Sequence, residues 1–216
     1  SSGGPTRYTP IYYKYGLPGS YDENWGFELM LQPIEDIRRG GNGRGRSLYY
    51  YNMACNVPLY LHIDLRGDNE NSLGLWWFAS TCRHFGIGGT HDNPLIAKQH
   101  RKAMQKYRDL ERFYKRGEFF GLAEEVHIHV LPEENSFVVN MFNLSDAPQV
   151  IEAKIKIRDI GLDPDMWYFS PYHISGIKGW SYGSGEMEFD SQAGTISIAR
   201  RIPPESPEVI HFRSIE

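Results

Sequence analysis

The pattern of apolar and polar positions changes near the middle of the chain. Before Leu122, apolar residues recur at helical spacing or form one continuous block, whereas after it they form short runs separated by turn residues. This change predicts a β/α part over residues 1–122 and an antiparallel β-domain over residues 123–216.

One buried strand stands out in the first part. Residues 57–65 (VPLYLHIDL) are almost all apolar, which is typical of a central strand in a parallel sheet. The turn RGDN follows, and Asp68 or Asn69 is expected to cap a helix over residues 70–84. Apolar side chains lie on more than one side of this helix, so we expect it to be covered on both sides.

A second strand and a long helix complete the first part. The segment FGIGG (residues 85–89) predicts a very short strand ending in glycines. A helix is expected to begin at Pro94, end at Lys115 or Arg116, and stop at Gly117. This alternation of helices and strands is typical of a parallel β/α architecture.

The second part predicts an antiparallel β-sandwich. Its residues alternate most clearly in 152–157, where apolar and charged side chains take turns. A domain of this length is a normal size for such a sandwich. The expected strands lie in the runs EVHIHVLP, SFVVNMFNLS, QVIEAKIKI, MWYFSP, GEMEFD, TISIA and EVIHFRSI.

Charge and composition exclude several classes of function. The net charge of -4 gives no reason to expect a nucleic-acid partner. No apolar run approaches the roughly 20 residues of a membrane span, so no membrane partner is expected. Cys55 and Cys82 show neither metal-ligand nor disulfide spacing, which favours buried thiols in a reducing compartment, the cytoplasm. GGNGRG lacks the P-loop pattern, and no cofactor is expected.

Polar side chains lie close together in the turn between the predicted strand and the predicted helix. Asp64, Arg66 and Asp68 fall within five residues, and His62 precedes them on the strand. This cluster is a candidate site. The alternative is that Asp68 or Asn69 caps the helix and Arg66 pairs with a nearby acid.

Histidine and tryptophan pairs give further candidates. His127 and His129 lie two residues apart and face one side of a strand, which suits zinc only with further ligands such as His62 or His211. We favour a cross-strand polar face and expect no metal.

Trp76 and Trp77 are expected in the core. Trp180, in GIKGWSYGSG, is the better candidate for an exposed aromatic side chain, the alternative being a loop residue packed onto the sandwich.

The stretch CRHFGIGG…YRDLERFYKRGEFFGL, followed by β sequence, resembles the end of an α-galactosidase-like glycoside hydrolase. In that family a (β/α)8 barrel precedes a C-terminal β-sandwich. The last barrel strand bears glycines, and the last helix carries a tyrosine and basic residues before a glycine-aromatic exit. Residues 85–89 and the side chains Tyr107, Arg108, Leu110, Gly117, Phe120 and Leu122 stand in matching order.

The resemblance implies a fold, a substrate class and site residues. The chain would be a partial (β/α) barrel segment joined to a β-sandwich, with residues 57–65 as the penultimate barrel strand. Carbohydrate would be the ligand. Asp22 or Glu23 would act as the acid/base, and His62, Asp64, Arg66, Asp68 and Trp180 would contact the sugar.

The resemblance also implies that the catalytic machinery is incomplete. Such barrels take about 250 residues, and the strand that carries the nucleophile has no counterpart here. Retaining glycosidases need two carboxyl groups about 5 Å apart. We therefore expect a homo-oligomer or a missing complementary half-barrel. The alternative is a non-catalytic carbohydrate-binding or structural fragment that folds by oligomerising.

Overall fold

A computed structural model describes residues 33–38, 53, 60–175 and 187–215. Internal contacts divide the chain into two compact units, Ser1–Arg108 and Asp109–Glu216. The division falls inside helix α6 (Pro94–Arg116). The domain bounds 1–122 and 123–216 stay a prediction.

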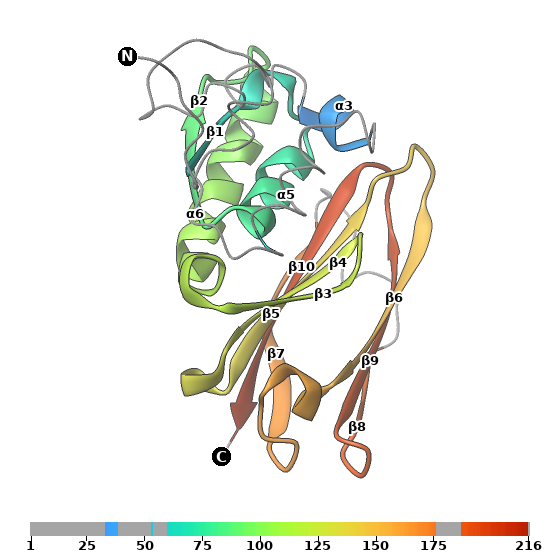
Figure 1. Ribbon diagram of the computed structural model, residues 1–216. Helices are drawn as coiled ribbons and strands as arrows, with labels where there is room; N and C mark the ends of the chain where they lie inside the picture. The colour runs from blue at the N-terminus through green and yellow to red at the C-terminus, as the bar shows by residue number, and fades with distance from the viewer. Residues whose placement is uncertain (1–32, 39–52, 54–59, 176–186, 216) are drawn as a thin grey trace, which may run out of the picture. The chain divides into compact units, whose positions relative to one another are not determined.

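The first unit contains a parallel pair of strands joined by a helix. Strand β1 (Tyr60–Asp64) pairs in parallel with β2 (His84–Gly88), from Tyr60 opposite His84 to Asp64 opposite Gly88. Helix α5 (Leu73–Thr81) connects them (Figure 1). The short helix α3 (Pro33–Arg38) contacts α5 and the 3-10 turn η2 (Leu65–Gly67). The predicted strand, the glycine-bearing strand and their parallel direction are confirmed.

Helix α5 is buried on every side. All nine of its residues are buried, Trp76 and Trp77 included, which confirms that these tryptophans pack in the core. The helix begins three residues later than predicted, because residues 68–72 form a turn held by the Asp68 side chain. It ends at Thr81 because His84 already belongs to β2.

Helix α6 begins and ends where the sequence predicts. Its last turn closes with the Gly117 N–H donating to the Phe113 carbonyl at 2.9 Å. A Cβ atom at residue 117 would lie 2.3 Å from that carbonyl oxygen, so only glycine fits there. On this helix Ile96 and Ala103 are half-buried, whereas His100 is fully buried.

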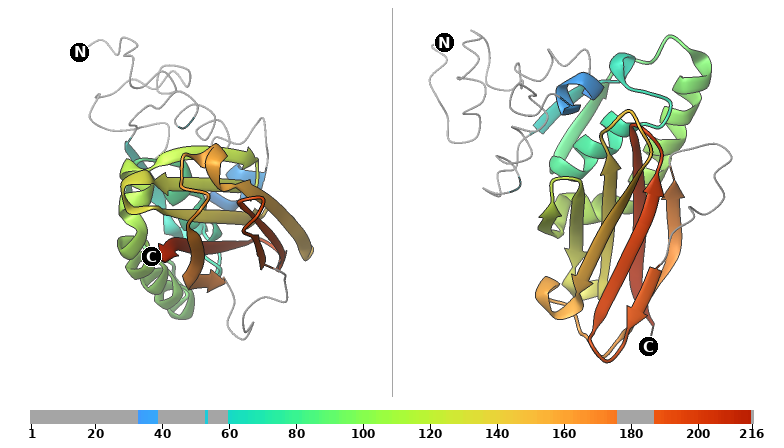
Figure 2. Two further views of the ribbon diagram at one scale, coloured as in Figure 1. Left: turned by 90° about the horizontal axis from the view of Figure 1, so that it is seen from below. Right: turned by 90° about the vertical axis from the view of Figure 1, so that its right-hand side faces the viewer.

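The second unit is a sandwich of two antiparallel sheets. The five-stranded sheet has the order β3-β4-β5-β10-β7, and the three-stranded sheet has the order β6-β9-β8 (Figures 1 and 2). Strand β3 precedes the predicted runs and was not predicted, because its residues were assigned to the exit from the last helix. The strands are β3 (Glu118–Ala123), β4 (Val126–Leu131), β5 (Ser136–Asn143), β6 (Gln149–Lys156), β7 (Trp167–Ser175), β8 (Met187–Asp190), β9 (Thr195–Ile202) and β10 (Ser206–Ile215).

The core of the second unit lies between the two sheets. Alternate residues point inward from both, and the predicted alternation in β6 is confirmed, with Ala153 and Ile155 buried and Lys154 and Lys156 exposed. Burial of this apolar surface is the main force that holds the sheets together.

Part of the outer face of the five-stranded sheet, on β4 and β5, is also buried. His127 and His129 share this face, as predicted, but aromatic rings surround them instead of an open polar surface. The Tyr114 ring of α6 contacts His129 edge-on, and its hydroxyl donates to Asn140 Oδ1 at 3.0 Å. The last turns of α6 thereby cover part of this face.

The described residues are therefore mostly antiparallel sheet with few helices. One parallel pair and its helix form a single β-α-β unit, which does not by itself establish a barrel segment. None of the helices in this part of the chain is long and apolar enough to cross a membrane.

Candidate functional site

An acid and an arginine form a close ion pair at the end of β1. The Asp64 carboxylate accepts hydrogen bonds from the Arg66 backbone N–H at 2.9 Å and from Arg66 Nε at 3.0 and 2.9 Å, and it also contacts Arg66 Nη2. The Asp64 side chain is 16% exposed and that of Arg66 is 58% exposed. A planar guanidinium suits two oxygens at once, so this pair holds a fixed geometry.

The pair keeps Asp64 ionised. The hydrogen bonds from the Arg66 side chain lower the pKa of Asp64, and the same contacts raise the pKa of Arg66. At neutral pH the carboxylate is therefore a hydrogen-bond acceptor and the guanidinium a donor. A carboxyl group with a lowered pKa is a poor general acid, so Asp64 is suited to binding and not to proton donation.

The end of β2 lies against this pair. Gly89 follows β2 with φ +68°, and a Cβ atom there would lie 2.6 Å from Asp64 Oδ1. Glycine thus permits both the backbone conformation and the close approach of the carboxylate. Asp92, three residues on, contributes further to the raised pKa of Arg66. The loops after the two parallel strands therefore bring Asp64, Arg66 and Asp92 to one edge.

Asp68 is fully buried, unlike Asp64 and Arg66, with which the sequence groups it. Its side chain is 0% exposed, and its oxygens accept from the backbone N–H groups of Gly74 at 2.8 Å and Leu75 at 3.0 Å. These contacts support the capping interpretation, since they satisfy donors in the first turn of α5. Burial raises the pKa of Asp68.

Sequence reasoning missed two histidines near this edge. His100, on α6, places Nε2 2.9 Å from the Asn69 carbonyl oxygen and 3.6 Å from Asp68 Oδ2. The His91 ring lies edge-on to it, with 6.1 Å between the ring centroids. His91 and Asp92 follow a predicted strand directly, so the strand-end rule that selected Asp64 could also have selected them.

The remaining predicted site residues lack described side chains. Asp22, Glu23 and Trp180 lie outside the described residues, and so does Cys55. His62 lies on β1 opposite Gly86, but its side chain is likewise outside them. Within the described ranges, no group of three or more His, Cys, Asp or Glu side chains is placed to hold a metal ion.

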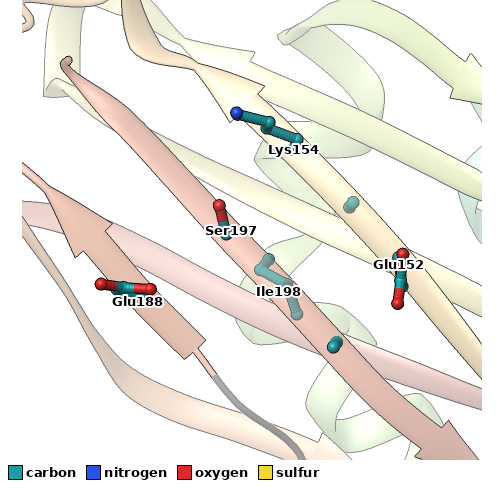
Figure 3. Close-up of a pocket in the computed structure, with 7 residues that line it drawn as sticks. Glu152, Lys154, Glu188, Ser197 and Ile198 are labelled. Atoms are coloured by element: carbon teal, nitrogen blue, oxygen red, sulfur yellow. The ribbon is translucent and has the colours of Figure 1, made fainter.

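A hollow lies on the outer face of the three-stranded sheet. It is a shallow depression of 460 Å³, and Figure 3 shows Glu152 and Lys154 on β6, Ser197 on β9 and Glu188 on β8. Lys154, Ser197 and Glu188 are in register across the three strands. The small side chains of the middle strand form the floor, and the charged residues at the sides are exposed to solvent.

Comparison with known proteins gives a partial likeness of fold. No protein-family model matches the sequence, and no curated protein sequence matches it. Two structures of a debranching enzyme from Nostoc punctiforme are similar, with TM-scores of 0.39 and 0.48, identities of 10% and 11%, and coverage of 71% and 83% of this chain. An α-amylase from Anoxybacillus has a TM-score of 0.43 and 10% identity over 87% of this chain.

These solved structures are longer than the present chain. The matches cover 36%, 46% and 51% of their respective lengths. Likenesses of this size assign neither a family nor an activity to the chain.

Proposed function

We propose that this chain is a glycoside hydrolase-related polypeptide that binds carbohydrate at the C-terminal ends of β1 and β2. The observation that carries the proposal is the Asp64–Arg66 pair, which stands at the end of β1 against Gly89 at the end of β2. In parallel β/α architectures, binding groups stand on the loops after the strands. The sequence resemblance to α-galactosidase-like enzymes supplies the substrate class.

The chemistry of the pair suits neighbouring sugar hydroxyls. Each hydroxyl can donate one hydrogen bond and accept others. The ionised Asp64 carboxylate accepts from one hydroxyl, and the exposed Arg66 guanidinium donates to the next. In this proposal Asp64 and Arg66 position the sugar and His62 adds a contact. Asp68 holds the loop in place through its hydrogen bonds to α5. Trp180 remains a proposed sugar contact of the β-domain.

The first experiment measures sugar binding by the full chain. Isothermal titration with a panel of neutral mono- and disaccharides is expected to find a ligand that Asp64→Asn weakens by about 10- to 100-fold, the range for a lost charge-assisted hydrogen bond. Glu134→Gln is the matched control, because Glu134 also pairs with an exposed arginine, Arg112, in the other unit. Equal affinities for wild type and Asp64→Asn would count against this site.

A separate experiment tests hydrolysis. The proposed proton donor is Asp22 or Glu23, so turnover of aryl glycosides is measured for wild type, Asp22→Asn and Glu23→Gln. Loss in one variant identifies the acid. Activity also needs a nucleophile, which we propose comes from a second copy or a complementary half-barrel. Light scattering at micromolar concentration is expected to show an oligomer, and a monomeric mass would argue against the homo-oligomer.

A second candidate function is carbohydrate binding by the β-domain without catalysis. Trp167, at the start of β7, is 62% exposed, and Phe189 contacts it edge-on at a centroid separation of 5.5 Å. An exposed indole held in this way can stack on an apolar sugar face. Sugar-dependent quenching of tryptophan fluorescence that Trp167→Ala abolishes would favour this function, and quenching that Asp64→Asn abolishes would favour the first.

A further inference from the structure

We propose that His100 is the positioning residue of the candidate site: its Nε2–H fastens the loop after β1 to helix α6. The hydrogen bond joins residues 31 positions apart in the sequence, from His100 Nε2 to the Asn69 carbonyl oxygen at 2.9 Å. The sugar-binding consequence rests on the proposed function, whereas the fastening of the loop does not.

The partner of Nε2 fixes the form of the imidazole ring. A carbonyl oxygen can only accept, so Nε2 must carry the proton, and in the neutral ring Nδ1 is then the nitrogen with the lone pair. The same Nε2 lies 3.6 Å from Asp68 Oδ2. Nδ1 is buried and has no hydrogen-bond partner among the described residues. The ring therefore acts on the loop through Nε2.

Two adjacent residues, Asp68 and Asn69, hold the loop between β1 and α5 in place. Asp68 fastens it to α5 through the Gly74 and Leu75 N–H groups, while Asn69 O accepts from both Ser72 N at 3.0 Å and His100 Nε2. Asp68 N also donates to Leu65 O at 3.2 Å, directly beside the ion-paired residues. Any displacement of Asn69 is thus transmitted to the turn that carries Arg66.

Burial makes this contact costly to lose. The side chains of His100 and Asp68 are 2% and 0% exposed, so water does not replace a missing donor there. Without the His100 ring, Asn69 O keeps the hydrogen bond from Ser72 N, but the loop loses this link to α6. The titratable groups known to face His100 are Asp68 from the loop and His91 from the segment before α6.

Two variants of His100 separate positioning from proton transfer. Gln places an amide N–H close to the position of Nε2, whereas Asn places its amide near Nδ1. His100→Gln is therefore expected to keep the loop in place, and His100→Asn to release it. A glutamine at residue 100 cannot gain or lose a proton near neutral pH. If His100 worked by exchanging its own proton, His100→Gln would therefore not restore its function.

The first readout is amide hydrogen exchange in the full chain. His100→Asn is expected to speed exchange at Gly74 and Leu75 about 10-fold or more, while His100→Gln stays within about threefold of wild type; these factors correspond to opening free energies of about 1.4 and 0.7 kcal/mol. Amides of β5 and β10 serve as the internal control. Unchanged exchange in His100→Asn, or equal acceleration in both variants, overturns the proposal.

The second readout needs no variant. Nitrogen-15 spectra of the imidazole at neutral pH are expected to show the proton of His100 on Nε2, and a ring protonated on Nδ1 alone overturns the proposal even if His100→Asn does not fold. Sugar affinity is then compared across the variants, and a loss confined to His100→Asn is expected. If wild type binds no sugar, the proposed function fails, while hydrogen exchange and the imidazole spectra still decide the role of His100.

Discussion

A buried ion pair between the two sheets of the sandwich allows a sharp test of the second unit. Arg200 on β9 and Glu208 on β10 both point between the sheets, with Arg200 Nε 3.1 Å from Glu208 Oε1 and side chains 9% and 3% exposed. Charges this deeply buried have lost most of their hydration, and each offsets part of that loss for the other.

The magnitude follows from the distance and the burial. At an effective dielectric constant of about 20, charges 3.1 Å apart attract by roughly 5 kcal/mol. Removing one partner leaves the other charge buried, so Arg200→Met or Glu208→Leu alone is expected to cost about 3–5 kcal/mol. Because domains are stable by only about 5–15 kcal/mol, each single variant is expected to lose a large share of the stability of the second unit.

The double variant is the decisive one. Arg200→Met with Glu208→Leu leaves no buried charge, so its stability is expected to lie within about 2 kcal/mol of wild type. The coupling energy of the double-mutant cycle should then exceed about 3 kcal/mol. The assay is urea unfolding followed by amide hydrogen exchange at β9 and β10, which reports on the second unit.

An exposed pair provides the control. Arg112 and Glu134 also form an ion pair, at 3.0 Å, but their side chains are 43% and 41% exposed. Breaking it with Glu134→Gln is expected to cost no more than about 1 kcal/mol. If the two single losses at Arg200 and Glu208 simply add in the double variant, the two charges do not depend on each other and the reasoning is refuted.

Two further predictions concern a glycine and a histidine. Gly89→Ala is expected to weaken sugar binding about 10-fold, because its Cβ meets Asp64 Oδ1 at 2.6 Å; Gly161→Ala, with φ +75° but open space around it, carries the backbone strain alone and should leave binding unchanged in the same titration. Burial lowers the pKa of His127 to about 3, so the folded form stays neutral while the unfolded chain gains a proton below about pH 6.5. This group alone should cost stability as pH falls from 6.5 toward 3, by about 1.4 kcal/mol per pH unit, and His127→Gln should lower the slope by that amount in urea titrations. Burial also lowers the pKa of His211, to about 4, so the slope from His211 should remain. An unchanged slope would show that His127 is not its source.

Local signals were enough to place many of the elements. Pro94 and Gly117 mark the two ends of α6, and both act through their own backbone geometry, which does not depend on the rest of the fold. The alternation in β6 and the apolar run of β1 likewise depend on near neighbours. The sequence also indicated the polar edge after β1, since residues at a strand end are adjacent in the chain.

Contacts between distant residues decided what the site can do. Asp64 and Asp68 are both acids of one turn, yet Asp64 pairs with the exposed Arg66 and Asp68 is buried beneath α5. His100 looked like one more residue of a helix face until the fold brought it to Asn69.

The difference between what the sequence predicts and what only the fold decides has a simple physical cause. Helix ends, turns and alternation depend on interactions over a few residues, which the sequence displays directly. Burial and partner choice depend on which segments the chain brings together, as with Gly89 beside Asp64 or Arg200 beside Glu208, and these are fixed only when the whole unit packs. The sequence by itself therefore determined most of the elements and one candidate edge, and the tertiary structure decided which of the charged residues there are buried and which are exposed.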